Sequence, residues 1–316
     1  MDFKRLFSFV RIAELGSLSR VADRMRIGQP ALSRQLRLLE EELGVELFAR
    51  HRRGMVLTEE GEELRSRVAG PLREIMQAVE DVRSLSQQLG GHIAFGLTPT
   101  IGNILAGPLT RRMATETPNV SLRIVEGYDA HLIDWLHRRE IDAALLYGPA
   151  SDYQMTAEEL LVEDLLLVGS SDSTLDPNTP VPVSSLADLP LVLPSHPNRL
   201  RVLVDNAAAK AGVRFNIRFQ ADSFSLMKNL VSAGLGYTVL PLSALNQSAV
   251  GGHLKYAPLK SPRVTRQLVF ATLPGRTPSR ASRVLRQTVR REISRLVIDG
   301  SWPAHLMFDL KDDGNS

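Results

Sequence analysis

Arginine and serine side chains gather in one short stretch near the start of the sequence. From Arg20 to Arg37 there are five arginines and one aspartate. Ser33, Arg34 and Arg37 are spaced so that a helix would place them on one side. A hydroxyl and two guanidiniums on one face can donate hydrogen bonds to phosphate oxygens and to base edges. The pattern predicts a nucleic-acid-binding helix, and a solvated basic surface is the alternative.

Three helical segments are predicted to position these residues. Gly16 should end the first, Ser17 or Ser19 can cap the second, and the third begins at Pro30, which has no amide hydrogen to leave unpaired. Apolar residues at helical spacing predict the buried faces: Phe3, Leu6, Phe7, Val10 and Ala13, then Leu18, Val21, Ala22 and Met25, then Leu32, Leu36, Leu39 and Leu43. A short helix, a tight turn and a basic second helix form a helix-turn-helix, which enters the DNA major groove.

A basic hairpin follows the predicted third helix. Residues 47–50 and 55–58 can form two short strands around a tip of His51, Arg52, Arg53 and Gly54. Such a tip beside a reading helix can contact phosphate or the minor groove. Thr58 is expected to cap the next helix, with Glu59 and Glu60 in its first turn.

The segment SLSRVADRMRIGQPALSRQLRLLEEELGVELFARHRRGMVLTEEG closely resembles the winged helix-turn-helix of LysR-type transcriptional regulators. It departs from that pattern at Gly28, usually serine, and Val21, usually alanine; glycine still caps acceptably and valine can still be buried. The resemblance implies a set of DNA-contacting residues: Gln29, Pro30, Ser33, Arg34 and Arg37 at the groove, Arg50, Arg52 and Arg53 at the backbone, and Ser17 and Ser19 in the serine-rich entry.

A long amphipathic helix is predicted from Thr58 to about Leu89. Its apolar residues recur about every 3.5 positions, as in a coiled-coil seam: Leu64, Val68, Leu72, Ile75, Val79, Val82, Leu85 and Leu89. Pro71 should kink or break it locally. The helix can pack on its own domain or pair with a second copy of the chain. In LysR-type regulators the equivalent helix forms the dimer, so we expect pairing.

From His92 onward, predicted strands alternate with predicted helices, which indicates an α/β fold with parallel sheets. Segments near 160–168 and 256–266 should cross between two lobes. The expected domains are a winged helix-turn-helix over 1–60, a linker helix over 61–89 and an effector-binding domain over 90–316. Its lobe I would span 90–162 and 267–316, and its lobe II 163–266. Ligands in such sheets bind at the carboxyl ends of strands, here between the lobes.

The second part also resembles the effector-binding domain of LysR-type regulators, which has the fold of periplasmic solute-binding proteins. VSAGLGYTVLP is the most specific piece of this match, and DAALLYGP and TPTIGNILAGPL are closest to the nitrogen-assimilation-control branch. Thr98 could be a simple helix cap or a ligand contact. Because members of this branch can act without a small-molecule coinducer, a cleft that binds no effector is the alternative. The expected effector contacts are Thr98, Thr100, Tyr147, Ser195, His196 and Phe224.

Other residue patterns carry less weight. His131, Asp134 and His137 are spread around one helix, so a solvated face is favoured over a metal site. Six arginines between Arg280 and Arg295 form a second basic stretch, for which a solvated or oligomer-facing surface is favoured over nucleic-acid binding. No phosphate loop, nucleophile elbow or paired-carboxylate motif is present, so neither an enzyme nor a cofactor is expected.

Composition fits a globular cytoplasmic protein of several domains. The 316 residues are 43% hydrophobic and 23% charged, with a net charge of +3 and no cysteine. No apolar run could span a bilayer, and the charged first residues lack a secretory pattern. The expected partners are double-stranded DNA, a small organic anion, RNA polymerase for an activator, and further copies of the chain as a dimer of dimers. The alternative is a cytosolic small-molecule binding protein or enzyme of the solute-binding fold.

Overall fold

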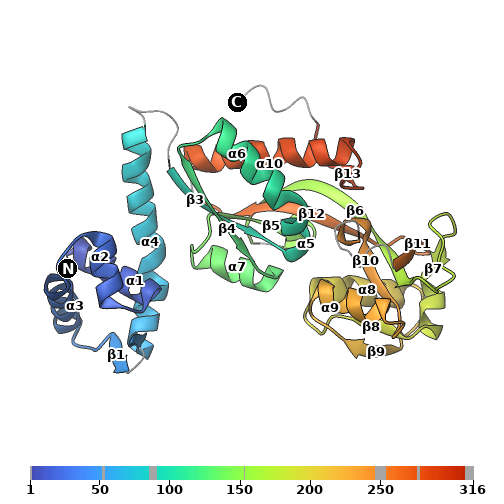
Figure 1. Ribbon diagram of the computed structural model, residues 1–316, viewed down its shortest axis with the longest axis horizontal. Coiled ribbons are helices and arrows are strands. Elements are labelled where there is room, and N and C mark those ends of the chain that lie inside the picture. The colour runs from blue at the N-terminus through green and yellow to red at the C-terminus, as the bar shows by residue number, and fades with distance from the viewer. Residues whose placement is uncertain are drawn as a thin grey trace. The chain divides into compact units, whose positions relative to one another are not determined.

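The computed structural model describes residues 2–51, 54–84, 91–152, 154–245, 254–275 and 278–309. The chain divides into two compact units, one of Met1–Gly91 with His137–Glu140 and one of His92–Leu136 with Ile141–Ser316 (Figure 1). Among the described residues, no helix has the length and apolar character needed to cross a membrane.

The first unit begins with the three expected helices, α1 (Phe3–Leu15), α2 (Leu18–Met25) and α3 (Gln29–Leu43). Gly16 ends α1 in the left-handed region with φ 63°, and the Ser17 hydroxyl accepts a hydrogen bond from the amide of Arg20. Gly28 is the N-cap of α3, so Pro30 is the second helical residue rather than the first. The break between α2, which ends at Met25, and α3, which begins at Gln29, confirms the predicted turn.

The buried faces differ in part from the prediction. In α1, Phe9 and Ile12 are fully buried whereas Phe3 is 38% exposed. The α1 sequence carries apolar residues on two overlapping stripes, and contact with the hairpin selects the stripe of Phe9, whose ring lies 5.5 Å from that of Phe48. Leu43 was also expected inside but is 38% exposed, because it lies in the last turn of α3.

The hairpin consists of β1 (Phe48–His51) and β2 (Gly54–Leu57), paired antiparallel as expected. The amide of Met55 donates to the carbonyl of Gly16 at 3.2 Å, which ties the hairpin to the end of α1. The Thr58 hydroxyl caps the following helix by accepting from the amide of Gly61 at 3.0 Å. A Cβ at Gly61 would lie 2.1 Å from the carbonyl oxygen of Leu47, so only glycine fits there.

Helix α4 (Glu59–Ser84) passes through Pro71 without a break, contrary to one of the two predicted outcomes. Its first half packs on its own unit, where Leu72 is buried with Phe9 and Leu39 in one core. Its second half exposes Ile75, Met76 and Val79. Leu85 and Leu89 lie outside the described residues.

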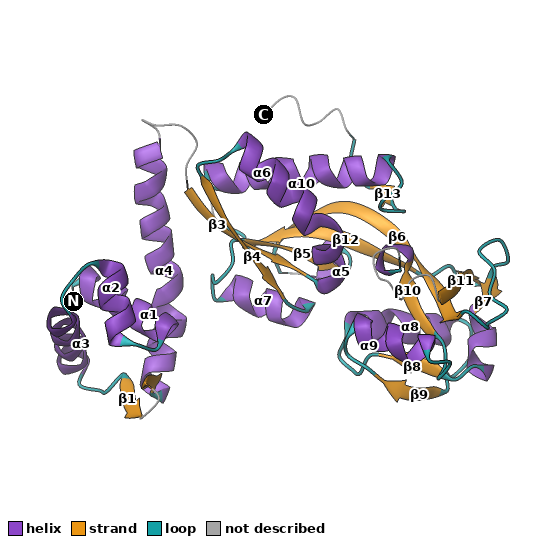
Figure 2. Cartoon of the chain, in the orientation of Figure 1, coloured by secondary structure: helices purple, strands orange, loops and turns teal. Residues whose placement is uncertain are grey.

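The second unit is built on a mixed sheet with the order β4-β3-β5-β12-β6-β11-β7, with β10 and β13 also paired to β6 (Figure 2). The strands are β3 (Gly91–Leu97), β4 (Val120–Glu126), β5 (Ala143–Tyr147), β6 (Thr156–Ser170), β7 (Val181–Pro182), β8 (Leu191–Leu193), β9 (Ile217–Gln220), β10 (Thr238–Pro241), β11 (Leu254–Lys260), β12 (Thr265–Thr272) and β13 (His305–Leu306). The helices are α5 (Pro99–Ile101), α6 (Gly107–Glu116), α7 (Asp129–His137), α8 (Arg199–Lys210), α9 (Phe224–Ser232) and α10 (Arg280–Ile298).

Strand β6 joins two lobes. Its first half pairs with β12 in lobe I, and from Leu165 onward it pairs with β10 and β11 in lobe II. All of these pairings are antiparallel. Among the described residues, parallel pairing is seen for β3 with β5, β8 with β9 and β11 with β7, so the sheets are mixed and not parallel throughout as expected. The reason is that later strands return along β6 instead of each following a crossover helix.

Each lobe has its own core. In lobe I, side chains of β5 alternate between the two faces of the sheet: Leu145 packs with α5, α6 and α10 on one face, and Leu146 packs with α7 on the other. Lobe II places Leu167, Val192 and Val231 in a separate cluster with α8 and α9. Two cores linked by extended strands allow a ligand site where the lobes meet.

Candidate nucleic-acid interface and effector cavity

Helix α3 presents a basic face. Gln29, Pro30, Arg34 and Arg37 are exposed, and Ser33 is half-buried. Among the described residues, the guanidiniums of Arg34 and Arg37 have no hydrogen-bond or ion-pair partner. Both charges are therefore uncompensated within the chain and can bind an anionic partner such as DNA.

Polar contacts fix the position of α3. The Ser8 hydroxyl of α1 donates to Gln35 at 2.6 Å, and Arg5 forms an ion pair with Glu42 at 3.0 Å. At the hairpin side, Glu40 accepts from the amide of Leu47 at 2.9 Å. None of these contacts involves Arg34 or Arg37, so they position α3 without using its two exposed arginines.

The remaining predicted DNA contacts lie at the helix entry and on the hairpin. The Ser17 hydroxyl caps α2 and lies 3.1 Å from the exposed Ser19 hydroxyl. Arg50 is in β1, where its backbone pairs with Met55. Arg52 and Arg53 lie outside the described residues.

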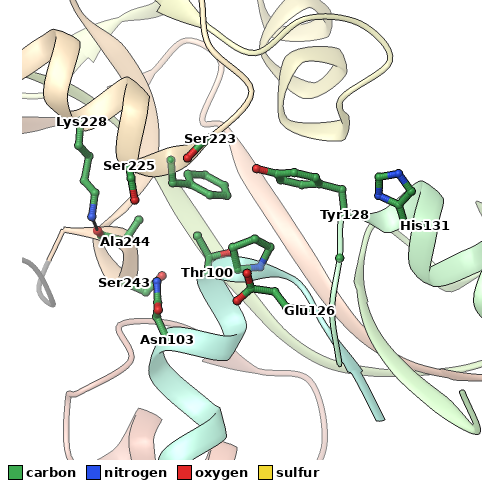
Figure 3. Close-up of a pocket in the computed structure, with 13 residues that line it drawn as sticks. Thr100, Asn103, Glu126, Tyr128, His131, Ser223, Ser225, Lys228, Ser243 and Ala244 are labelled. Atoms are coloured by element: carbon green, nitrogen blue, oxygen red, sulfur yellow. Dashed lines mark hydrogen bonds between the residues drawn. The ribbon is translucent and has the colours of Figure 1, made fainter. Parts of the chain in front are cut away.

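A cavity of about 580 Å³ lies where the two lobes of the second unit meet. Its lining comes from segments that follow the carboxyl ends of four strands: Thr100 after β3, Glu126 at the end of β4, Ser223 after β9 and Ser243 after β10 (Figure 3). This is the position at which α/β sheets bind ligands. Asn103 also lines the cavity, from a π-helical turn, Gly102–Ala106.

Two lining residues connect the lobes or carry charge at the cavity wall. The Tyr128 hydroxyl of lobe I donates to the carbonyl oxygen of Asp222 in lobe II, and burial raises the pKa of this tyrosine. On α9, the Lys228 ammonium donates to the carbonyl oxygen of Ala244 at 2.9 Å. Burial lowers the pKa of Lys228, because a half-buried ammonium has lost water contacts.

Beneath the cavity lies a buried polar network centred on Glu163 of β6. Glu163 forms an ion pair with Arg266 at 2.7 Å, and their side chains are 1% and 3% exposed. The carboxylate also accepts hydrogen bonds from Tyr147 at 3.1 Å, Ser243 at 2.8 Å and Trp302 at 3.1 Å. Burial raises the pKa of Tyr147, so its hydroxyl stays protonated as a donor. The network therefore joins lobe I, lobe II and the strand between them.

Comparison with known protein families identifies both units. A family model described as the bacterial regulatory helix-turn-helix protein of the lysR family matches residues 3–62, and one described as the LysR substrate binding domain matches residues 86–294. The chain belongs to the LysR family. It is a DNA-binding transcriptional regulator with an effector-binding domain, and not an enzyme.

Individual relatives agree with this assignment. The nitrogen assimilation regulatory protein nac of Escherichia coli is 31% identical to this LysR-type regulator over 285 residues, covering 89% of the chain and 90% of the relative. The structure is similar to that of a full-length OxyR variant from Pseudomonas aeruginosa, with a TM-score of 0.72, 24% identity and coverage of 93% and 94%. It is also similar to full-length CbnR complexed with its target DNA, with a TM-score of 0.68, 19% identity and coverage of 92% and 100%.

The cavity of this LysR-type regulator contains two of the six predicted effector residues, Thr100 and Phe224. Thr98 and Tyr147 are buried but are not part of the lining, and the Thr98 hydroxyl makes no helix-cap hydrogen bond. Ser195 donates to Asp222 at 2.6 Å, and His196 lies 3.0 Å from Asp205, so both side chains have partners away from the lining.

Other lining residues were not among the predicted contacts: Asn103, Glu126, Tyr128, His131, Ser223, Ser225, Lys228 and Ser243. Glu126 could have been found, because it ends a predicted strand of lobe I at the carboxyl end. His131, for which the sequence favours a solvated helix face over a metal site, lines the cavity and stacks on Trp135. Within the described ranges, no group of three metal-ligating side chains is close enough to hold an ion.

Proposed function

We propose that this LysR-type regulator reads a promoter or operator in double-stranded DNA with Gln29, Pro30, Ser33, Arg34 and Arg37 of α3. Arg50, Arg52 and Arg53 of the hairpin would contact the DNA backbone, with Ser17 and Ser19 beside them. The observation that supports this most is the exposure of Arg34 and Arg37, which have no partner among the described residues. Their guanidiniums can bind base edges or phosphates without first breaking an internal ion pair.

A salt-dependent gel shift tests this proposal. The full-length protein should bind a fragment of its own upstream region with nanomolar affinity and lose affinity steeply as salt rises. Arg67→Ala is a matched control, because Arg67 is exposed on α4 and paired with Glu63 at 2.6 Å. The proposal fails if no promoter fragment competes better than random DNA.

We also propose that two chains pair through the second half of α4. Ile75, Met76 and Val79 are exposed there on a helix whose first half is already packed. Pairing would bury these side chains and bring together two reading helices for two half-sites. A dimer of dimers in the cytoplasm, with RNA polymerase as a further partner if the protein activates transcription, completes the proposal.

The cavity is proposed to bind a small organic anion that alters DNA binding. Thr98, Thr100, Tyr147, Ser195, His196 and Phe224 remain the proposed contacts, with Thr100 and Phe224 on the cavity wall. Thr100→Val should abolish the ligand response and leave operator binding intact, because it removes one hydroxyl at constant volume. Thr115→Val on the exposed surface of α6 serves as the control. Equal ligand responses in the two variants would remove Thr100 from the site.

A further inference from the structure

The two walls of the cavity carry opposite charges. Lobe I contributes the carboxylate of Glu126, and lobe II contributes the ammonium of Lys228 (Figure 3). Most of the other polar groups of the lining are neutral hydroxyls and an amide, and His131 lies at the Tyr128 side. A ligand that satisfies both walls must therefore carry charge of both signs.

The lobe I wall is rich in hydrogen-bond acceptors. The Glu126 carboxylate lies over Gly102, where an added Cβ would be 3.2 Å from Oε2. Among the described residues it has no hydrogen-bond or ion-pair partner. Glu126 is exposed, and a cationic ligand group that replaces water at its carboxylate would form a charge-assisted hydrogen bond there.

Two hydroxyls near Glu126 have their hydrogens directed away from the cavity. Ser243 donates its only side-chain hydrogen to Glu163. Tyr147 also donates to Glu163, so the 3.5 Å contact between Thr100 and Tyr147 uses the hydrogen of Thr100. Ser243 and Thr100 therefore present lone pairs to the cavity, and a ligand ammonium would find acceptors from both.

The lobe II wall favours a negative group. Helix α9 spans nine residues, and its N-cap, Ser223, makes no side-chain cap hydrogen bond. The first amides of α9 therefore have no acceptor from the side chain of this N-cap, and they lie beside Ser225 on the cavity wall. Lys228 lies one turn further along the same helix, half-buried. A ligand carboxylate would interact with the helix start and with this ammonium together.

We propose that the cavity binds a zwitterion of the amino-acid class, with its ammonium on Glu126, Thr100 and Ser243 and its carboxylate on Lys228 and the start of α9. This inference rests on the proposed effector response and narrows its ligand, proposed above as a small organic anion, to a carboxylate that also carries an ammonium group. A dicarboxylate fits less well, because its second carboxylate would lie beside Glu126. The cavity volume of about 580 Å³ is within the range of small-molecule sites.

The test is calorimetric titration of the full-length protein with the twenty standard amino acids. For each one that binds, its decarboxylated amine and its deaminated acid are titrated as matched probes. We expect at least one amino acid to bind, and both truncated probes to bind at least about tenfold more weakly, because each loses one charge-assisted contact.

Charge-removing variants then locate the two ends of the ligand. Glu126→Gln and Lys228→Met should each lower the affinity for the amino acid by about tenfold or more. Glu159→Gln of β6 and Lys210→Met of α8 are the matched controls, because neither residue lines the cavity, and they should leave binding unchanged. Circular dichroism confirms that each variant is folded.

Three results would overturn the inference: no amino acid binds at millimolar concentration, the deaminated acids bind as well as the parents, or Glu126→Gln leaves binding unchanged. If dicarboxylates bind in place of amino acids, the ligand class is wrong while the proposed effector response stands. If amino acids bind but the protein has no operator preference in the gel shift, the proposed DNA function fails while the ligand class stands.

Discussion

Helices α3 and α10 of this regulator both carry exposed arginines but use their guanidiniums differently. On α3, Arg34 and Arg37 are exposed and have no partner among the described residues. On α10, arginines pair with acidic residues of the same unit: Arg286 and Arg290 with Glu158, Arg291 with Glu116, and Arg295 with Glu292 and Asp299. The sequence shows arginines on one face of each helix. Glu158 and Glu116, which the fold brings to α10, distinguish its paired arginines from the unpaired ones of α3.

The paired arginines of the second unit also differ among themselves in burial. The pair of Arg295 with Asp299 is more than one-third exposed on both sides, so it contributes little to stability. Arg266 and Glu163 are almost completely buried, and breaking such a pair leaves an uncompensated charge. The arginines of the two units therefore fall into three groups: unpaired and exposed, paired and exposed, and paired and buried.

The largest effect is expected for the buried ion pair of Glu163 and Arg266. Glu163→Gln should lower the free energy of unfolding by about 3–5 kcal/mol, because the Arg266 guanidinium would stay buried without a counter-charge. Urea unfolding followed by circular dichroism measures this change. Glu159→Gln on the same strand is the control. If Glu163→Gln lowered the free energy of unfolding no more than this control, the buried Arg266 guanidinium would not need the Glu163 carboxylate.

The next largest effect is expected for the unpaired arginines of α3 and concerns DNA affinity. Arg34→Ala should cost about 1–3 kcal/mol of binding free energy on the operator and relax base preference at one position. Gel shifts with operator variants measure this, with Arg67→Ala as the control for the loss of one surface charge. Equal losses on operator and random DNA would contradict a base contact.

A smaller effect is expected from the hairpin. Arg53→Ala should weaken binding to all DNA sequences and lower the slope of log affinity against log salt by about one, because one phosphate contact is lost. Gel shifts at several salt concentrations measure the slope. An unchanged slope would remove Arg53 from the DNA contacts.

The smallest effect is expected on α10. Arg286→Ala should change DNA affinity by less than about 0.5 kcal/mol, because the guanidinium lies 3.5 Å from Glu158 and its charge is largely compensated. The same gel shift measures it. If the salt slope fell as far as for Arg53→Ala, α10 would be a second DNA surface and the comparison with α3 would fail.

Local features could be predicted from the sequence because they depend on neighbouring residues. The turn at Gly28 and Pro30, the cap at Thr58 and the end of the first helix at Gly16 were all identified in this way. The buried face of α1 was not, because its sequence supports two stripes and the hairpin residue Phe48 selects between them.

Features that join distant segments were beyond the sequence. The antiparallel pairing of β6 depends on strands that return about 70 to 116 residues later along the chain, so the sheet is mixed and the expected parallel pairing holds only in part. Thr100 was predicted because it follows the first strand and matches the family resemblance, and Phe224 was predicted as a cleft residue. Lys228 and Ser243 reach the cavity only through the packing of lobe II. The same holds for Glu158 and Glu116, which are distant in sequence from the α10 arginines that they pair with.

Strand β6 and Trp302 also affect the order of folding. The core of lobe I combines residues before Leu161 with residues after Leu268, including the fully buried Trp302. Lobe II lies entirely within the intervening segment. During synthesis, lobe II can therefore be completed first, while the early strands of lobe I wait for β12, α10 and Trp302. Until β12 is synthesised, the edge of β5 that it covers has no partner strand. An unpaired strand edge of this kind can pair with other chains.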